Sequence, residues 1–298
     1  MPLADLVDDV PKILEKWPTG PTLFRRDPAD LAHLWSLAEF DALVDAECLP
    51  ARNVVLLKDG KVLERHAYID GDMPRPGAVR AHLDGGGTVS ARRLQTVKPS
   101  LSLLRREIQD ETGCPVHVNA YLTPPGAQGL KYHYDPYVTL IVQLSGRKAW
   151  PLHPPFVENP TTEHGNFLER GFTPEERHHL VRTAPVQSFA LEPGDVFWLP
   201  RGYVHSPYTV GGEPSLHLTF ALKERTFHWP ASEMTREILS QALVDPALRA
   251  EIPPASLLAA PDAAVRWTRE YLIGALLLLE AGHVAEVARK AAARVGGQ

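Results

Sequence analysis

The sequence predicts a mainly β fold, either a sandwich or a barrel, with helices on both flanks. Between residues 116 and 222, short runs of alternating apolar and polar residues are separated by turns that contain glycine or proline. The chain has 28 prolines in 298 residues, and this number argues against a helical bundle. Helical patterns occur before and after this region. We therefore expect a β core with helices at both ends.

The amino-acid composition is typical of a folded globular protein and excludes several other classes of protein. With 44% hydrophobic and 22% charged residues, the chain has enough apolar material for a large folded core. A net charge of -5 gives no general attraction to nucleic acid or to an anionic membrane. Cys48 and Cys114 are too few for a disulfide scaffold, and the first residues carry acids where a secretory signal would carry lysine or arginine. We therefore expect a cytoplasmic protein that binds neither nucleic acid nor membranes.

The first half of the chain is expected to hold short helices and a hairpin. Residues 1–50 have the pattern of short helices, and Pro28–Val44 has apolar residues near a 3.6 period, with Asp27 as a plausible N-cap. Asn53–Ile69 has the pattern of two strands around an Asp59-Gly60 turn. The segments that follow are expected to be a loop over residues 70–92 and a helix over Leu101–Asp110 that ends near Gly113.

Alternation is clearest in the first strand of the β region. Val116, Val118, Ala120 and Leu122 would share one face, and the other face would carry His117, Asn119, Tyr121 and Thr123. Further strands are expected over Tyr137–Leu144, over Ser188–Pro200 around a Pro193-Gly194 turn, and over Ser215–Leu222. Residues 156–184 have weak periodicity, which indicates an insertion at one edge; the sequence leaves open whether it forms a lid.

The domain organisation follows from a change of composition after Arg225. Residues 1–225 are expected to form one β domain with its N-terminal helices and hairpin, and residues 226–298 a helical region. Helices are expected over Ala231–Leu243 and over Asp262–Val295, the second interrupted near Gly274 and Gly282. This helical region would pack on the barrel or on another subunit, in which case the protein would be a homodimer.

Two segments far apart in the chain carry metal-binding residue types. His133 and Asp135 are two residues apart at the mouth of an expected strand, so both side chains would leave on one face. His205 ends a run in which Gly194, Pro200 and Gly202 mark turns between strands. Two imidazoles and one carboxylate leave coordination positions open, as in non-haem Fe(II) sites that activate O₂. A structural zinc site would need four closed ligands, and the two cysteines are badly placed for it.

The segment Asn119–Trp150 resembles the JmjC-type cupin oxygenases, specifically the ribosomal-oxygenase-like branch of protein hydroxylases. The resemblance covers about residues 20–222. It rests on Asn-x-Tyr-x-Thr-Pro, Gln-Gly-Leu, His-x-Asp, Gln-Leu-x-Gly-x-Lys-x-Trp and the Gly-Asp…Pro-x-Gly…His block. It implies a double-stranded β-helix core, Fe(II), the cosubstrate 2-oxoglutarate, and O₂.

The resemblance also implies roles for individual residues. His133, Asp135 and His205 would be the iron ligands and would carry the catalysis through the iron. Lys148 would pair with the distal carboxylate of 2-oxoglutarate, as a buried dicarboxylate requires a cation. Asn119 would contact the cosubstrate, or would be a polar strand residue with a partner inside the barrel. Thr139 and Tyr121 face the same side by strand parity and could line the cosubstrate pocket.

The function implied is hydroxylation of an unactivated C–H bond, with a protein or peptide side chain as the substrate. Residues 226–298 show no basic winged-helix pattern, a departure from the ribosomal branch that leaves the substrate open. Three alternatives remain: a hydroxylase of a small amino-acid-derived metabolite, a lysine demethylase that uses the same oxidant, and a non-catalytic metal-binding cupin that acts as a sensor or scaffold. A cupin lyase or isomerase with another metal is a further possibility.

Overall fold

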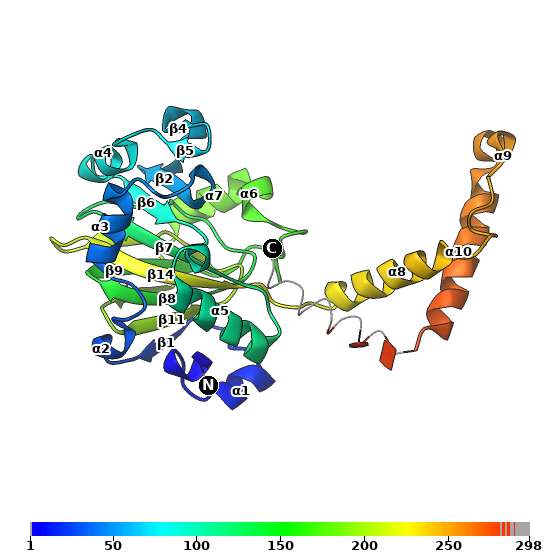
Figure 1. The fold of residues 1–298 in the computed structure, drawn as a ribbon, viewed down its shortest axis with the longest axis horizontal. Helices are drawn as coiled ribbons and strands as arrows, with labels where there is room; N and C mark the ends of the chain where they lie inside the picture. The colour runs from blue at the N-terminus through cyan, green and yellow to red at the C-terminus, as the bar shows by residue number, and fades with distance from the viewer. Residues whose placement is uncertain (1, 281, 284, 287–288, 290–298) are drawn as a thin grey trace. The chain divides into compact units, whose positions relative to one another are not determined.

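The computed structural model describes residues 2–280, 282–283, 285–286 and 289, and these form two compact units (Figure 1). The first unit comprises Met1–Glu224 and contains all the strands of the described chain. The second comprises Arg225–Gln298 and is helical in its described part. No helix among the described residues is long and apolar enough to cross a bilayer.

The N-terminal helices are shorter than the sequence pattern predicts. The expected helix over Pro28–Val44 is wrong, because the structure has two helices, α2 (Pro28–Leu31) and α3 (Leu37–Asp45). The chain breaks between them with Ser36 as the N-cap of α3, and the buried Leu34 and Trp35 lie in this break. The capping role of Asp27 is confirmed, since its side chain accepts a hydrogen bond from the Ala29 N–H. The other elements of this region are η1 (Pro2–Asp5), α1 (Val10–Glu15) and β1 (Thr22–Arg25).

The expected hairpin is confirmed at its turn, where β2 (Val54–Lys58) and β3 (Lys61–Val62) pair around Asp59-Gly60. The loop expected over residues 70–92 is wrong. It contains a helix, and its last residues form a strand buried between β2 and β7 (Val116–Thr123), so packing outweighs the glycine content. The elements are η2 (Ala51–Asn53), η3 (Arg65–Ala67), β4 (Ile69–Asp70), β5 (Met73–Pro74), α4 (Ala78–Asp84), β6 (Thr88–Ala91) and η4 (Leu94–Thr96).

The helix expected before the β region is confirmed as α5 (Pro99–Thr112). It ends at Gly113, whose φ of 66° is the left-handed conformation that glycine adopts without strain. Leu101 and Ile108 of α5 are fully buried in the main core. The helix thereby covers the outer face of the large sheet near the start of β7 (Val116–Thr123) (Figure 1).

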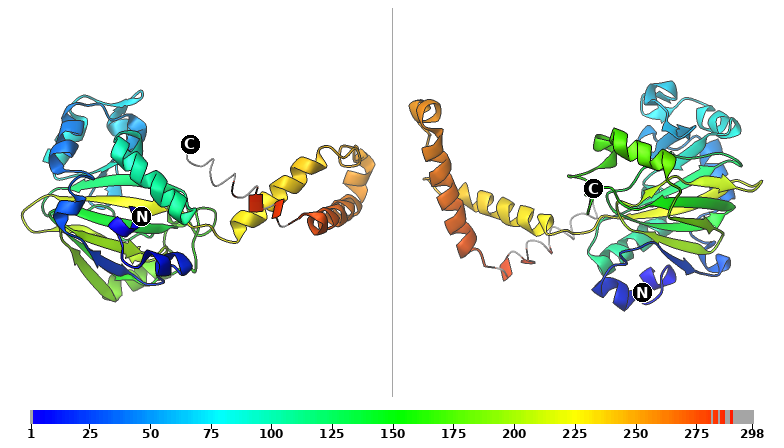
Figure 2. Two further views of the ribbon diagram at one scale, coloured as in Figure 1. Left: turned by 60° about the horizontal axis from the view of Figure 1, so that its bottom comes forward. Right: turned by 180° about the vertical axis from the view of Figure 1, so that it is seen from behind.

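The β region forms two sheets, as the barrel prediction requires (Figures 1 and 2). The large sheet has eight strands in the order β1-β11-β8-β14-β7-β6-β2-β3. The small sheet has the order β10-β9-β12, with β13 also paired to β9. The remaining strands are β8 (Val138–Ser145), β9 (Arg147–His153), β10 (Gln187–Leu191), β11 (Asp195–Leu199), β12 (Val204–His205), β13 (Tyr208–Val210) and β14 (Ser215–Leu222).

Strand parity assigns each side chain of the large sheet to one of two cores. The even-numbered residues of β7, from Val116 to Leu122, are buried in the main core with the N-terminal helices, as expected. The interior between the sheets holds a smaller core, made of Ile141, Trp150, Leu152, Leu191, Phe197 and Leu199. The odd-numbered residues of β7 share this interior face, so the polar residues of the sequence pattern line the barrel.

The insertion over residues 156–184 contains no strand; its described elements are α6 (Phe167–Arg170) and α7 (Pro174–Arg182). Thr173 and Glu176 form a capping box at the start of α7. Leu180 and Phe172 pack with Tyr134 in a small aromatic cluster. The insertion therefore packs against Tyr134, which lies in the chain between the two candidate metal ligands His133 and Asp135.

The turn between β10 and β11 depends on Gly194, which has a φ of 95°. A Cβ at this position would lie 2.5 Å from the Arg26 carbonyl oxygen. We expect Gly194→Ala to reduce the free energy of unfolding by about 2 kcal/mol or more, through backbone strain and this clash. Urea denaturation measures the loss. Gly212→Ala is the control, because nothing lies within 4 Å of that Cβ, and an equal loss in both variants would contradict the prediction.

The second unit contains α8 (His228–Ala242), α9 (Pro254–Ala259) and α10 (Pro261–Leu278). The expected helix over Ala231–Leu243 corresponds to α8. The expected helix over Asp262–Val295 corresponds to α10 as far as Leu278. The interruption expected near Gly274 is wrong, because α10 continues through that residue, whereas the helix does end before Gly282, and residues 282–283, 285–286 and 289 are again helical. Part of the remainder of that range lies outside the described residues. Apolar side chains on these helices are exposed, among them Leu239, Leu258, Leu277 and Leu278.

Candidate metal centre

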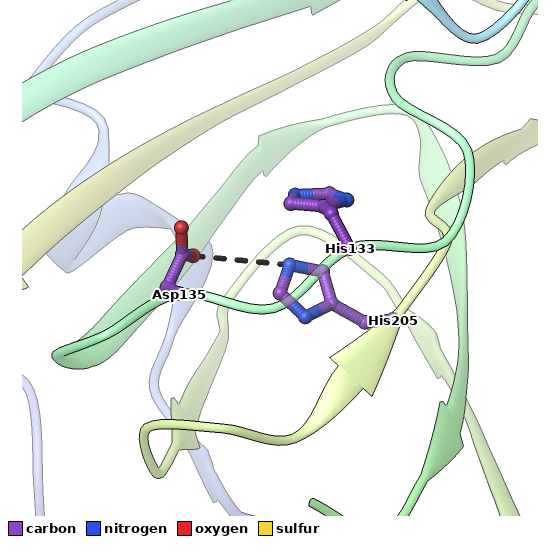
Figure 3. Close-up of side chains that lie close together, drawn as sticks. All are labelled: His133, Asp135 and His205. Atoms are coloured by element: carbon purple, nitrogen blue, oxygen red, sulfur yellow. Dashed lines mark ion pairs between the residues drawn. The ribbon is translucent and has the colours of Figure 1, made fainter. Parts of the chain in front are cut away.

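The three candidate metal ligands come together although they are not in one strand. His133 and Asp135 lie in the connection between β7 and β8, not at the mouth of a strand as the sequence pattern predicts. The backbones of His133 and His205 pair through two hydrogen bonds, of 3.0 Å and 2.8 Å. This bridge sets their rings side by side, with centroids 4.2 Å apart (Figure 3). The Gly202 N–H donates to the Asp135 carbonyl at 2.9 Å and holds the carboxylate beside them.

The distances between donor atoms fit one cation. One ligand atom from each of the three residues lies within 4.8 Å of the others. The Asp135 Oδ2 and His205 Nε2 are 3.8 Å apart, which is too long for a hydrogen bond between them (Figure 3). A metal ion bonded at about 2.0–2.2 Å to each atom would span this gap.

Both imidazoles are held in the tautomer that a metal requires. The Nδ1 atom of His133 lies 2.8 Å from the Lys131 carbonyl oxygen, and that of His205 lies 2.9 Å from the Tyr203 carbonyl oxygen. A carbonyl oxygen can only accept, so each Nδ1 carries the proton and each Nε2 keeps its lone pair. The main chain therefore orients both ligands before any metal binds.

Burial sets the charge of these groups in the absence of a cation. The pKa of His205 lies well below its usual value because the ring is buried and faces His133. Burial raises the pKa of the Asp135 carboxyl, and His133 and the Arg92 guanidinium oppose this rise. Two neutral nitrogen donors and a carboxylate suit Fe(II) with positions left open, and a divalent cation would stabilise the ionised carboxylate.

Lys148 is a buried cation with no anionic partner. It is 2% exposed on β9, and its Nζ donates to the Thr123 Oγ1 at 2.8 Å. It forms no ion pair in the described part of the chain. Burial lowers its pKa to about 7. A buried ammonium held only by a hydroxyl is costly, and the carboxylate of a bound dicarboxylate would remove that cost.

The structure places the other predicted cosubstrate residues on the interior face of the large sheet, with different surroundings. The Tyr121 ring stacks on the His217 ring at 5.0 Å and lies near enough to Asp135 to interact with its charge. Thr139 is buried and pairs with Ala221 across β8 and β14. The side chain of Asn119 accepts a hydrogen bond from the Arg93 N–H at 3.0 Å. Asn119 thus has the structural partner that the alternative interpretation predicts.

Three further residues lie at the site although the sequence pattern indicated no role there for them: Thr123, Trp150 and His217. Thr123 accepts the Lys148 hydrogen bond, and the Trp150 ring lies 5.5 Å from His205 and 5.6 Å from His217. The buried His217 also interacts with the charge of Lys148, which contributes to its lowered pKa. Strand parity did place Thr123 on the same face as Asn119 and Tyr121. Only the closure of the two sheets shows which of these side chains meet.

Comparisons with known proteins agree with this geometry. A family model described as the JmjC domain matches residues 93–229, a span that includes all three candidate ligands and Lys148. Ribosomal oxygenase 2 of Bos taurus is 30% identical over 270 residues, which cover 84% of this chain and 54% of that protein. The chain contains a JmjC domain over residues 93–229.

Other similar proteins include the bifunctional lysine-specific demethylase and histidyl-hydroxylase NO66 of Aedes aegypti. It is 27% identical over 214 residues, which cover 72% of this chain and 33% of that protein. The JmjC chain therefore spans between about a third and about half of these two curated relatives.

Solved structures show the same fold. YcfD, a ribosomal oxygenase from Escherichia coli in complex with cobalt and 2-oxoglutarate, matches with a TM-score of 0.54 at 17% identity. The match covers 93% of this chain and 69% of that one. The mainly β fold with helical flanks, expected from the sequence as a cupin core, is thereby confirmed as the JmjC fold.

Proposed function

We propose that this JmjC protein is an Fe(II)- and 2-oxoglutarate-dependent oxygenase that uses O₂ to hydroxylate an unactivated C–H bond in a protein or peptide side chain. The observation that carries the proposal is the pairing of an open two-histidine, one-carboxylate cluster with a buried ammonium that has no anion. The first suits Fe(II), and the second suits the far carboxylate of 2-oxoglutarate. The names of the similar proteins, which include oxygenases and a histidyl-hydroxylase, support a protein substrate.

Each group in the site has a separate task. The Nε2 atoms of His133 and His205 and the Asp135 carboxylate would hold the metal, in the tautomers that the main chain fixes. Lys148 and the Thr123 hydroxyl would bind the distal end of 2-oxoglutarate, and Tyr121, Thr139 and Asn119 stay predicted as further contacts. When bound, iron and 2-oxoglutarate supply the O₂-dependent oxidising chemistry. The apolar interior excludes water around them.

Two measurements test this function. Fe(II) and 2-oxoglutarate added without oxygen should give a weak visible charge-transfer band. With O₂ and candidate peptides, mass spectrometry should then show a gain of one oxygen atom and formation of succinate. Iron binding without the band and without succinate would favour the non-catalytic sensor instead. Turnover without consumption of O₂ would favour a lyase or isomerase.

Two alternative substrate classes would react at the same metal centre, and the product formed distinguishes them from a hydroxylated protein side chain. A small amino-acid-derived metabolite would gain oxygen while peptides would not. A methylated lysine peptide would lose a methyl group, and the name of the Aedes aegypti relative includes such an activity. We favour hydroxylation of a protein side chain, because the names of the similar proteins include ribosomal oxygenases and a histidyl-hydroxylase.

The affinity for 2-oxoglutarate should depend on pH through Lys148. Its pKa is about 7 in the protein without cosubstrate, and the carboxylate binds the protonated ammonium. We therefore expect the affinity to fall by up to about tenfold per pH unit above pH 7, as the ammonium loses its proton. Titration of the Mn(II)-loaded protein with 2-oxoglutarate at pH 6, 7, 8 and 9 measures this. An affinity that stays constant up to pH 9 would contradict a role for this ammonium.

Location and assembly stay predictions. We propose a cytoplasmic protein and a homodimer formed through the C-terminal helices. The exposed apolar side chains of α8 and α10 support such an interface. Sedimentation of the full chain at several concentrations tests the dimer, and a monomer throughout would contradict it.

A further inference from the structure

A cluster of basic side chains gathers at the start of β7, apart from the metal centre. It consists of His117 in β7, Arg93 just before η4, Arg105 in α5 and Lys223 just after β14. All three cations interact electrostatically with His117. The main chain holds two of them in place, since the Lys223 N–H donates to the Pro115 carbonyl at 2.9 Å and the Arg93 N–H to the Asn119 side chain at 3.0 Å. We call these four residues the basic cluster.

The basic cluster has no counter-ion in the described part of the chain. Arg105 is only 8% exposed, and its side chain donates a hydrogen bond to the neutral Gln109 at 2.8 Å. The exposed Asp110 interacts with Arg105 without forming an ion pair. Glu224 follows Lys223 in sequence, but its carboxylate accepts from the Val138 N–H at 3.0 Å and lies 3.7 Å from Arg201.

Three polar atoms of the cluster are buried without a hydrogen-bond partner: the Nε of Arg93, the Nε of Arg105 and the Nδ1 of His117. Burial and the three cations together lower the pKa of His117 to about 4, so its imidazole is neutral at pH 7. Buried donors and cations are costly unless an acceptor or an anion meets them. Orphaned polar atoms among three cations that all interact with one imidazole indicate a place for an oxyanion.

The cluster lies on the strand that leads to the metal centre. His117, Asn119, Tyr121 and Thr123 alternate along the interior face of β7. At about 3.3 Å per residue, His117 is about 13 Å from Tyr121, which lies beside Asp135. An extended peptide covers the same length in about four residues. The cluster is therefore within reach of a polypeptide whose target side chain is at the metal centre.

We propose that the basic cluster is an anion-binding subsite that receives a carboxylate side chain of the substrate polypeptide, about three to five residues from the oxidised residue. This proposal rests on the proposed function. It requires that the substrate segment be acidic near its target residue. A strongly basic segment would be repelled by the three cations.

Calorimetry with a defined probe tests the subsite. The full-length protein, saturated with Mn(II) and 2-oxoglutarate at low ionic strength, is titrated with acetyl-tetraglutamate amide and with its tetraglutamine analogue. We expect the acidic peptide to bind at least about tenfold more tightly than the neutral one. Lys223→Gln and Arg93→Gln should each weaken its binding by about fivefold or more. Arg106→Gln is the matched control, because it removes the same charge from an exposed neighbour on α5 and should change binding by less than about twofold.

Three outcomes would overturn the proposal: equal binding of both peptides, equal weakening by Arg106→Gln and Lys223→Gln, or a site filled by inorganic phosphate but not by the acidic peptide. The last would make the cluster a site for a small free anion. Thermal unfolding of each variant shows that it is folded. The charge-transfer band with Fe(II) and 2-oxoglutarate is measured on the same variants. If the band persists while the peptides bind equally, the subsite is wrong and the proposed function stands.

Discussion

His205→Ala is expected to abolish metal-dependent turnover. The substitution removes one of two nitrogen donors and leaves His133 and Asp135, whose geometry alone does not enclose a cation. Loss of a group that merely orients a ligand costs about 10–100-fold in metal affinity or activity, so loss of the ligand should cost more. We expect Fe(II) affinity to fall by about 100-fold or more, and 2-oxoglutarate-dependent succinate formation by about 1,000-fold.

The matched control is His178→Ala, which removes an exposed histidine from α7. It should keep both metal binding and turnover. Because His205 is buried, His205→Asn provides a second variant of closer size, and thermal unfolding shows whether each protein is folded. A folded His205→Ala protein that keeps a tenth of the turnover would show that His205 is not a ligand.

Lys148→Met is expected to have two effects of opposite sign. It should weaken 2-oxoglutarate binding by about 30-fold or more, because the loss of one partner of a buried charge pair costs about 2–5 kcal/mol. It should also stabilise the protein without cosubstrate by about 1–4 kcal/mol, since an apolar chain of similar length replaces a buried ammonium that has no anion. A lysine that serves only the fold would not show this pair of effects.

The stabilisation should depend on pH in a defined direction. The pKa of Lys148 is about 7 in the folded protein, below its usual value of 10.5, so the unfolded chain binds this proton more tightly. The native protein therefore loses stability as the pH falls from about 10 to about 7, and the loss is constant below that. The increase in the free energy of unfolding caused by Lys148→Met should be largest at pH 6 and should vanish near pH 10.5. Urea denaturation at pH 6, 8 and 10 measures it, with the exposed Lys61→Met as the control. An unchanged affinity for 2-oxoglutarate in Lys148→Met would contradict the assigned role.

The sequence predicted correctly those structural elements that depend only on residues close to one another in the chain. The Asp27 cap, the Asp59-Gly60 turn, the end of α5 at Gly113 and the alternation of β7 are as expected. Each follows from side-chain capping, from glycine conformation or from strand parity, and none needs a distant partner. The break after Leu31 and the buried strand β6 were missed, because burial against the large sheet outweighs their local pattern.

The sequence by itself determined the chemical types at the centre, two histidines with one carboxylate and a lysine, as well as the mainly β class. Only the tertiary structure decided their arrangement. The backbone bridge between His133 and His205, the bond from Gly202 to Asp135 and the contact of Lys148 with Thr123 all join segments distant in the chain. The basic cluster also exists only after α5 and the end of β14 meet β7. The physical reason is that residue identity fixes donors, charge and parity, whereas the distance between donors and the presence of a counter-ion depend on how the sheets and helices pack.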